Sequence, residues 1–218
     1  MPSNIPGPSH DTRQHLTVAA LRTKVAQRLA LLDPAADLVR VLDAYGGDGD
    51  VWRHVATLTD TRIEVTSVDQ RSHARTQLTV DNRRFIASVD LSRFDLVDLD
   101  AWGFPAEQLA LVADQQYAGT VTYTAIALGL TQAPAVVLAA SGIPHEWRAV
   151  AQRLVSTATH PADAWLEFCS RLGYPHHVLA DDRSRPPARY LYGACGNLEH
   201  WTPARQAEAD ATVTKARL

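Results

Sequence analysis

Several aspartates follow short apolar runs in this sequence, and the first of them precedes a cluster of glycines. Asp43 ends the run Leu38–Leu42 and is followed by Ala44-Tyr45-Gly46-Gly47-Asp48-Gly49, and Asp69 ends a second run. Glycines let the backbone turn tightly and approach a ligand closely, because no Cβ is in the way. An acidic residue at the end of the next strand is placed to bind the hydroxyls of a ribose. The pattern therefore indicates a site for a nucleotide-like ligand.

A second pair of carboxylates, Asp98 and Asp100, lies in the segment Phe94–Pro105, whose first half is strongly apolar. A carboxylate beside a buried strand is partly desolvated, which is unfavourable unless the group is paired or used. Either aspartate can accept hydrogen bonds from an amine and so orient its lone pair. Trp102, two residues beyond Asp100, is suited to stacking on a flat base.

These residues require strands whose carboxyl ends meet at one edge of a sheet. Apolar runs alternate with helical patterns, which predicts right-handed βαβ crossovers and a largely parallel, Rossmann-like α/β sheet with helices on both faces. Ligands bind such sheets at the carboxyl ends of the strands, where the strand order reverses. The strands expected are 38–42, 62–68, 84–89, 94–100 and 120–128, and the helices 11–32, 50–58, 71–80 and one after Pro105.

The second half of the chain is less regular. Helices are expected over 144–156 and 161–172, each beginning with a proline at a position that suits the first turn. Strands 176–179 and 189–195, joined by a polar loop over 181–187, predict an antiparallel C-terminal hairpin at the sheet edge. Residues 1–10 are expected to form a disordered arm, and 11–218 a single domain.

The order of these features resembles the class I S-adenosylmethionine-dependent methyltransferases over about residues 38–130. Val41–Gly49 is similar to their first motif, and Phe94–Pro105 to their fourth, closest to the form found in tRNA guanine-N2 methyltransferases of the dimethyltransferase type. The resemblance implies S-adenosylmethionine as cofactor and a nucleobase amine of RNA or DNA as acceptor. It implies these roles: cofactor binding by Asp43, Tyr45, Gly47, Gly49, Asp69 (ribose) and Asp90 (adenine), and acceptor contacts by Asp98, Asp100 and Trp102.

Other interpretations remain open at the level of the sequence. The glycines suit a turn that binds nothing, Asp69 and Asp90 suit helix caps, and Tyr45 and Trp102 suit the edge of a core. The third glycine of a dinucleotide fingerprint is replaced by Trp52, which disfavours an NAD-dependent oxidoreductase. Ala101 and Phe104 depart from the fourth motif, which keeps a non-catalytic binding or assembly module as an alternative.

Charge and composition exclude several functions. The formal net charge is −3, with 21 Lys and Arg against 24 Asp and Glu, whereas proteins that hold duplex nucleic acid usually have a basic excess. A structured RNA, a single strand or a small molecule remain as partners, and Arg183–Arg189 followed by tyrosines is the one basic cluster suited to a single strand. Two cysteines and scattered histidines predict no metal site. With no apolar run long enough to span a membrane and no signal peptide, a cytoplasmic location is expected.

Overall fold

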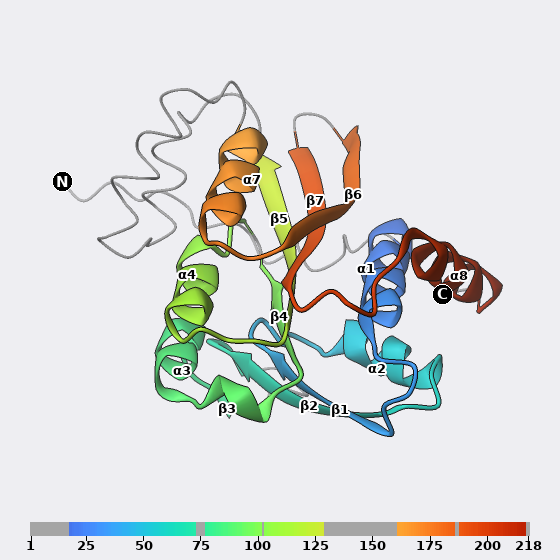
Figure 1. Cartoon of the computed structure of the whole chain (residues 1–218), viewed down its shortest axis with the longest axis horizontal. Coiled ribbons are helices and arrows are strands. Elements are labelled where there is room, and N and C mark those ends of the chain that lie inside the picture. The colour runs from blue at the N-terminus through green and yellow to red at the C-terminus, as the bar shows by residue number, and fades with distance from the viewer. Residues whose placement is uncertain (1–17, 73–76, 102, 129–160, 186–187, 217–218) are drawn as a thin grey trace.

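The computed structural model describes residues 18–72, 77–101, 103–128, 161–185 and 188–216. In this part of the chain, seven strands form one sheet in the order β3-β2-β1-β4-β5-β7-β6 (Figure 1). Their bounds are β1 Leu38–Asp43, β2 Arg62–Asp69, β3 Leu78–Thr79, β4 Leu96–Asp100, β5 Thr120–Leu128, β6 His176–Arg185 and β7 Ala188–Gly196.

The strands from β3 to β5 are parallel, and the hairpin β6–β7 adds two antiparallel strands at one edge. The predicted fold class is therefore confirmed: a mostly parallel, Rossmann-like sheet that ends in a C-terminal antiparallel hairpin. The chain adds strands to one side of β1 through β2 and β3, and to the other side through β4 and β5. The point where the strand order reverses thus lies between β1 and β4, where open α/β sheets bind ligands.

Helices cover both faces of the sheet (Figure 1). Val25 of α1, Val55 of α2 and Val213 of α8 share one apolar cluster with Val41 of β1. Leu42, the next residue of β1, belongs to the opposite cluster, which contains residues of α3, α4 and α7. This alternation follows from the two-residue period of a strand. The helices are α1 Val18–Leu31, α2 Asp50–Thr57, α3 Asn82–Ser88, α4 Ala106–Asp114, α7 Pro161–Arg171 and α8 Pro203–Lys215.

Most elements were expected close to where they lie. The strands β1, β2, β4 and β5, the helices α2, α4 and α7, and the antiparallel hairpin confirm the predictions for those segments. Strand β6 is longer than expected and runs to Arg185, so most of the predicted polar loop over 181–187 is strand. The arm over 1–10 and the helix predicted over 144–156 lie outside the described residues.

Two predictions between β2 and β4 are wrong. The segment 84–89, expected as the third strand, belongs mostly to helix α3, and the described end of the helix expected over 71–80 forms β3. The cause is Asp81, whose carboxylate accepts hydrogen bonds from the backbone N–H groups of Arg83 and Arg84 and so caps α3. Asn82 and Ile86, one turn apart, are the buried residues of this helix.

Helix α8 was not predicted. Thr202 caps it and Pro203 opens it, and Ala209 and Val213 pack against the α1 side of the molecule. Among the described residues, no helix combines the length and the apolar character needed to cross a membrane.

Candidate functional site

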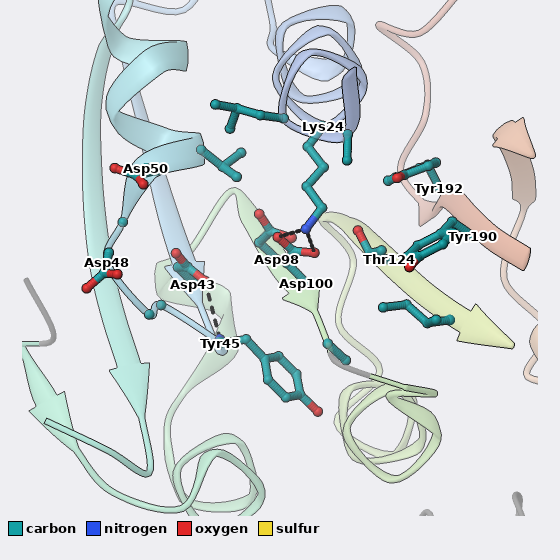
Figure 2. Close-up of a pocket in the computed structure, with 18 of the residues that line it drawn as sticks. Lys24, Asp43, Tyr45, Asp48, Asp50, Asp98, Asp100, Thr124, Tyr190 and Tyr192 are labelled. Carbon is teal, nitrogen blue, oxygen red and sulfur yellow. Dashed lines mark hydrogen bonds and ion pairs between the residues drawn. The ribbon is translucent and has the colours of Figure 1, made fainter. Parts of the chain in front are cut away.

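A cleft of about 460 Å³ opens at the carboxyl ends of β1, β4 and β5, next to the point where the strand order reverses. One wall is the turn from β1 to α2, and the other is formed by α1, β5 and the hairpin β6–β7 (Figure 2). The volume lies in the range of pockets that hold small ligands. The cleft is thus where the sequence pattern predicted a ligand.

The β1–α2 turn is built from glycines that pack closely on β2. Gly46 N–H donates to the Val68 carbonyl at 3.0 Å, and a Cβ on Gly46 would lie 1.8 Å from Ser67 Oγ. Gly47 and Gly49 have φ angles of 46° and 69°, in the left-handed region that glycine adopts without strain. Gly49 is also the N-cap of α2. These glycines are therefore required by the backbone path of the turn.

Asp69, at the end of β2, is joined to this turn. Its Oδ2 accepts a hydrogen bond from Gly47 N–H at 3.1 Å, and its Oδ1 accepts one from Arg71 N–H at 2.8 Å. The carboxylate therefore fixes the turn relative to β2.

Asp98 is buried at the centre of the molecule and bound on all sides. Its oxygens accept hydrogen bonds from Arg28 Nη2 at 2.6 Å, Arg28 Nε at 3.1 Å, Trp52 Nε1 at 2.8 Å and Thr122 Oγ1 at 2.9 Å. A carboxylate offers about four lone-pair positions, so these contacts use its acceptor capacity. Asp98 ties α1, α2 and β5 to β4, which suits a structural role.

Asp100, two residues further along β4, is held differently. Lys24 Nζ of α1 lies 2.7 Å from both carboxylate oxygens, and its hydrogen bond goes to Oδ2. Asp100 Oδ1 is occupied by this ion-pair contact, whereas Thr124 Oγ1, on the neighbouring strand, is buried and forms no hydrogen bond with the described residues. A buried polar group without a partner typically costs about 1–3 kcal/mol, so Thr124 Oγ1 is suited to receiving a ligand.

Burial affects Asp100 and Asp43 differently. Burial alone would raise the pKa of Asp100, but the charges of Lys24 and Arg28 outweigh it and hold that pKa below its ordinary value. Burial raises the pKa of Asp43 well above its ordinary value, and the charges of Asp98 and Asp100 raise it further. Asp100 is therefore ionised at neutral pH, whereas Asp43 keeps its proton to a higher pH than an ordinary carboxyl group.

The lining is rich in carboxylates. Six aspartates line the cleft, and three of them are paired with cations: Asp98 with Arg28, Asp100 with Lys24 and Asp50 with Arg53. The aspartates are Asp43, Asp48, Asp50, Asp98, Asp100 and Asp182. A lining of this kind offers acceptor oxygens to the hydrogen-bond donors of a ligand.

The structure brings together most of the residues predicted from the sequence. Six of them line the cleft: Asp43, Tyr45, Gly47, Gly49, Asp98 and Asp100. Asp69 lies behind the turn and contacts Gly47. Asp90 is not part of the lining described, because it is exposed at the start of a 3-10 turn, Leu91–Arg93, and accepts hydrogen bonds from Ser92. Trp102 lies outside the described residues.

Sequence reasoning missed the contributions of α1 and of the hairpin. Lys24 and Arg28 are one helical turn apart and reach Asp100 and Asp98, which lie more than 65 residues further along the chain. Thr124, Tyr190 and Tyr192 line the second wall of the cleft. The sequence did contain a signal for the two cations of α1: Lys24 and Arg28 lie next to Val25 on the buried side of the helix, where cations need partners.

Comparison of the sequence with protein-family models gives no match, and neither does comparison with curated proteins. Solved structures with a similar fold include the Mtq2–Trm112 complex of E. cuniculi, with TM-score 0.47 and 14% identity, covering 88% of this chain and 97% of that one. Trm1 from Pyrococcus horikoshii, solved with S-adenosyl-L-methionine, has TM-score 0.49 and 15% identity, covering 93% of this chain and 60% of that one. A geranyl diphosphate methyltransferase, solved with the same compound, has TM-score 0.45 and 10% identity, covering 86% and 92%. TM-scores below 0.5 do not establish a common function, so the activity is inferred below from the cleft itself.

Proposed function

We propose that the chain is an S-adenosylmethionine-dependent methyltransferase that transfers a methyl group to an amine. The proposal rests on the carboxylate-lined cleft beside a glycine-rich turn at the switch point of a parallel sheet. S-adenosylmethionine is a nucleoside with an ammonium group and ribose hydroxyls, so it has the shape that such a turn accepts and donor groups that carboxylates can bind.

The same lining disfavours the alternative, an NAD-dependent oxidoreductase. A dinucleotide places its pyrophosphate on the glycine-rich turn and the N-terminus of the next helix. Here Asp48 and Asp50 flank that position, and both line the cleft. The third glycine of the fingerprint allows close packing of helix and strand. Its place is filled by Trp52, which is buried against Asp98.

The cofactor is assigned to residues according to their chemistry. Asp43 is suited to the ammonium group, the backbone at Gly47 and Gly49 to the methionine part, and Asp69 to the ribose hydroxyls. The motif resemblance implied an adenine contact for Asp90. Because the third strand ends at Thr79, we assign this contact to Val80–Asp81 instead. When bound, the cofactor supplies an activated methyl group, which the lone pair of an acceptor takes as the carbon–sulfur bond breaks.

Asp100 is the residue we assign to the acceptor. It is ionised, lines the cleft and lies beside Thr124, whose buried hydroxyl forms no hydrogen bond with the described residues. Hydrogen bonds from the N–H groups of an amine to the carboxylate of Asp100 would hold the nitrogen lone pair in one direction, and orientation accounts for much of the rate of such a transfer. The fourth-motif resemblance implies a nucleobase amine of RNA or DNA. Asp98 holds Arg28, whose charge helps to keep Asp100 ionised.

Calorimetric titration of the protein with S-adenosylmethionine and with NAD tests the proposal. We expect binding of the first in preference to the second. Asp69→Ala should weaken binding about tenfold or more, because a hydrogen bond to a charged group contributes about 1.5–3 kcal/mol. Asp60→Asn, which removes an exposed carboxylate away from the cleft, is the charge-matched control and should bind as the wild type does.

The outcomes separate the alternatives. Absence of S-adenosylmethionine binding at high micromolar concentration contradicts the proposal. Tighter binding of NAD than of S-adenosylmethionine would indicate an NAD-dependent oxidoreductase instead. Binding without methyl transfer to any RNA, DNA or small-molecule pool favours the binding module. Transfer that is lost in Asp100→Ala while cofactor binding is kept supports the role given to Asp100.

A further inference from the structure

Lys24 places an amine nitrogen at the carboxylate that we assign to the acceptor. Its Nζ lies 2.7 Å from both oxygens of Asp100 and donates a hydrogen bond to Oδ2. Figure 2 shows the side chain of Lys24 extending from α1 into the cleft, with Nζ between the turn that carries Asp43 and the wall that carries Thr124. Asp100 therefore already holds an amine inside the cleft.

The surroundings keep this amine in place. The side chains of Lys24 and Asp100 are only 11% and 15% exposed, so solvent screens their attraction less than it would at the surface. The neighbouring carboxylate, Asp98, is bound by Arg28, so the two cations of α1 have one carboxylate each. An amine from outside would have to displace Lys24 from Asp100, whereas Lys24 needs no such exchange.

The nitrogen also lies beside the part of the cleft that we assign to the methionine part of the cofactor. Lys24 and Asp100 line the same cavity as Asp43, Gly47 and Gly49. Asp43 pairs with Asp98 between β1 and β4, and Asp100 follows two residues later on the same face of β4. The methionine part carries the reactive methyl group on its sulfur. A nitrogen held at Asp100 is therefore on the side of the cleft where that methyl group is expected.

We propose that Lys24 is itself a methyl acceptor, so that the chain modifies its own helix α1 at Nζ. The inference rests on the proposed function, because it names an acceptor of that same site. Lys24 first loses a proton to solvent, since an ammonium nitrogen has no free lone pair. Nζ then bonds to the methyl carbon as the carbon–sulfur bond breaks, and the electron pair of that bond stays on the sulfur of S-adenosylhomocysteine. The positive charge moves to Nζ, and the methylammonium product remains paired with Asp100.

The chain supplies an internal control, because it contains two lysines, Lys24 and Lys215. Lys215 is exposed on α8, and Lys24 is buried and lines the cleft. A chemical reagent should therefore modify Lys215 first, whereas transfer within the cleft should modify Lys24 first. The order of modification distinguishes the two kinds of reaction.

Mass spectrometry of the full chain tests the inference after incubation with S-adenosylmethionine at about pH 9, which favours the neutral amine. Cleavage at arginine separates Thr23–Arg28, with Lys24, from Gln206–Arg217, with Lys215. We expect one CH2 group to be added to Thr23–Arg28 at least about tenfold faster than to Gln206–Arg217, because the cleft holds the reacting groups together. The rate constant should not depend on protein concentration. Reductive methylation with formaldehyde and cyanoborohydride, without cofactor, should show the opposite order.

A binding measurement tests the position of Nζ without any transfer. S-adenosylmethionine has a positive charge on sulfur that S-adenosylhomocysteine lacks. Lys24→Met removes the ammonium beside Asp100 and leaves a carboxylate to face the sulfonium. By calorimetry, the preference for S-adenosylmethionine over S-adenosylhomocysteine should rise at least about threefold. Lys215→Met is the matched control and should leave the preference unchanged.

Several results would overturn the inference. Methylation of Lys215 before Lys24 would indicate surface reactivity, and an unchanged preference in Lys24→Met would place Nζ away from the sulfonium. Binding of S-adenosylmethionine without methylation of Lys24 contradicts the inference alone and leaves the proposed function in place. Absence of S-adenosylmethionine binding contradicts the proposed function, and the inference with it.

Discussion

Asp43, the buried carboxylate that we assign to the cofactor, should lower the stability of the folded protein at neutral pH. It is buried at the end of β1, near Asp98 and Asp100, and accepts a hydrogen bond from Tyr45 N–H at 3.3 Å. Burial and the two neighbouring charges raise its pKa above the ordinary carboxyl value of 3.8. The folded protein therefore binds a proton at Asp43 more strongly than the unfolded chain does.

The consequence for stability can be measured. A group with a raised pKa contributes stability that is fully present below its ordinary value and is lost as the pH rises through the folded value. Asp43→Asn should therefore raise the melting temperature at neutral pH and remove part of the decline in stability above about pH 4. The same variant should bind S-adenosylmethionine about tenfold or more weakly, because it removes the carboxylate that we assign to the ammonium group. Unfolding curves over a range of pH, with calorimetry, check both parts. A variant less stable than the wild type at neutral pH would contradict this account of Asp43.

Asp98 and Asp100 should respond differently to the same substitution. Asp98→Asn leaves Arg28, which is completely buried, without its counter-charge, and breaking a buried pair costs about 3–5 kcal/mol. Asp100→Asn should cost less stability, because Lys24 and Asp100 lie nearer to solvent, and should instead abolish methyl transfer. Urea unfolding and a methyl-transfer assay on both variants test whether Asp98 serves stability and Asp100 serves methyl transfer. Equal losses of stability would contradict it.

Among the residues that line the cleft, the sequence indicated those that lie close together in the chain. Asp43, Gly47 and Gly49 were predicted because a strand, a turn and a helix follow one another directly. Lys24 was not, because its partner Asp100 is 76 positions away and only the folded sheet brings them together. Asp90 was placed at the cofactor because the third strand was expected at the wrong segment.

At the scale of elements, one wall of the cleft depends on the close packing of the β1–α2 turn against β2. Gly46→Ala would place its Cβ 1.8 Å from Ser67 Oγ and 3.0 Å from Ser67 Cβ, so the turn or the strand must shift. We expect a loss of about 1–3 kcal/mol, typical of an overpacked site. Ser67→Gly should recover part of that loss in the double variant, because it removes both atoms. Unfolding free energies of the four proteins in the cycle measure the coupling, and strictly additive effects would contradict direct contact.

The elements that sequence patterns predicted well are those with long, regular signals. The buried strands β1, β4 and β5 contain runs of branched and aromatic residues, and α7 shows helical spacing after a proline. The segment 82–88 is too short for periodicity to distinguish helix from strand, and Phe85-Ile86 alone suggests a strand. Its cap at Asp81 was the better indicator. Helix α8 has few apolar residues, and only its packing on α1 through Ala209 and Val213 explains it.

For the whole molecule, ligand binding should appear as thermal stability. A ligand at about 100 times its dissociation constant adds about 2.7 kcal/mol to the free energy of unfolding. For a chain of this size, S-adenosylmethionine should then raise the melting temperature by about 5–10 °C. NAD at the same concentration should leave it unchanged, and Asp69→Ala should reduce the shift. A larger shift with NAD would contradict the charge argument.

The contact between Gln27 and Gly193 has a consequence for the order of events during synthesis. Gln27 Nε2 of α1 donates to the Gly193 carbonyl of β7 at 2.6 Å, across 166 positions of the chain. Contacts this distant in sequence form late, because a long loop must close first. Helix α1 therefore leaves the ribosome early but cannot complete its docking until β7 has been made. Lys24 reaches Asp100 from the same helix, so a nascent chain has the glycine-rich turn long before it has a working cleft.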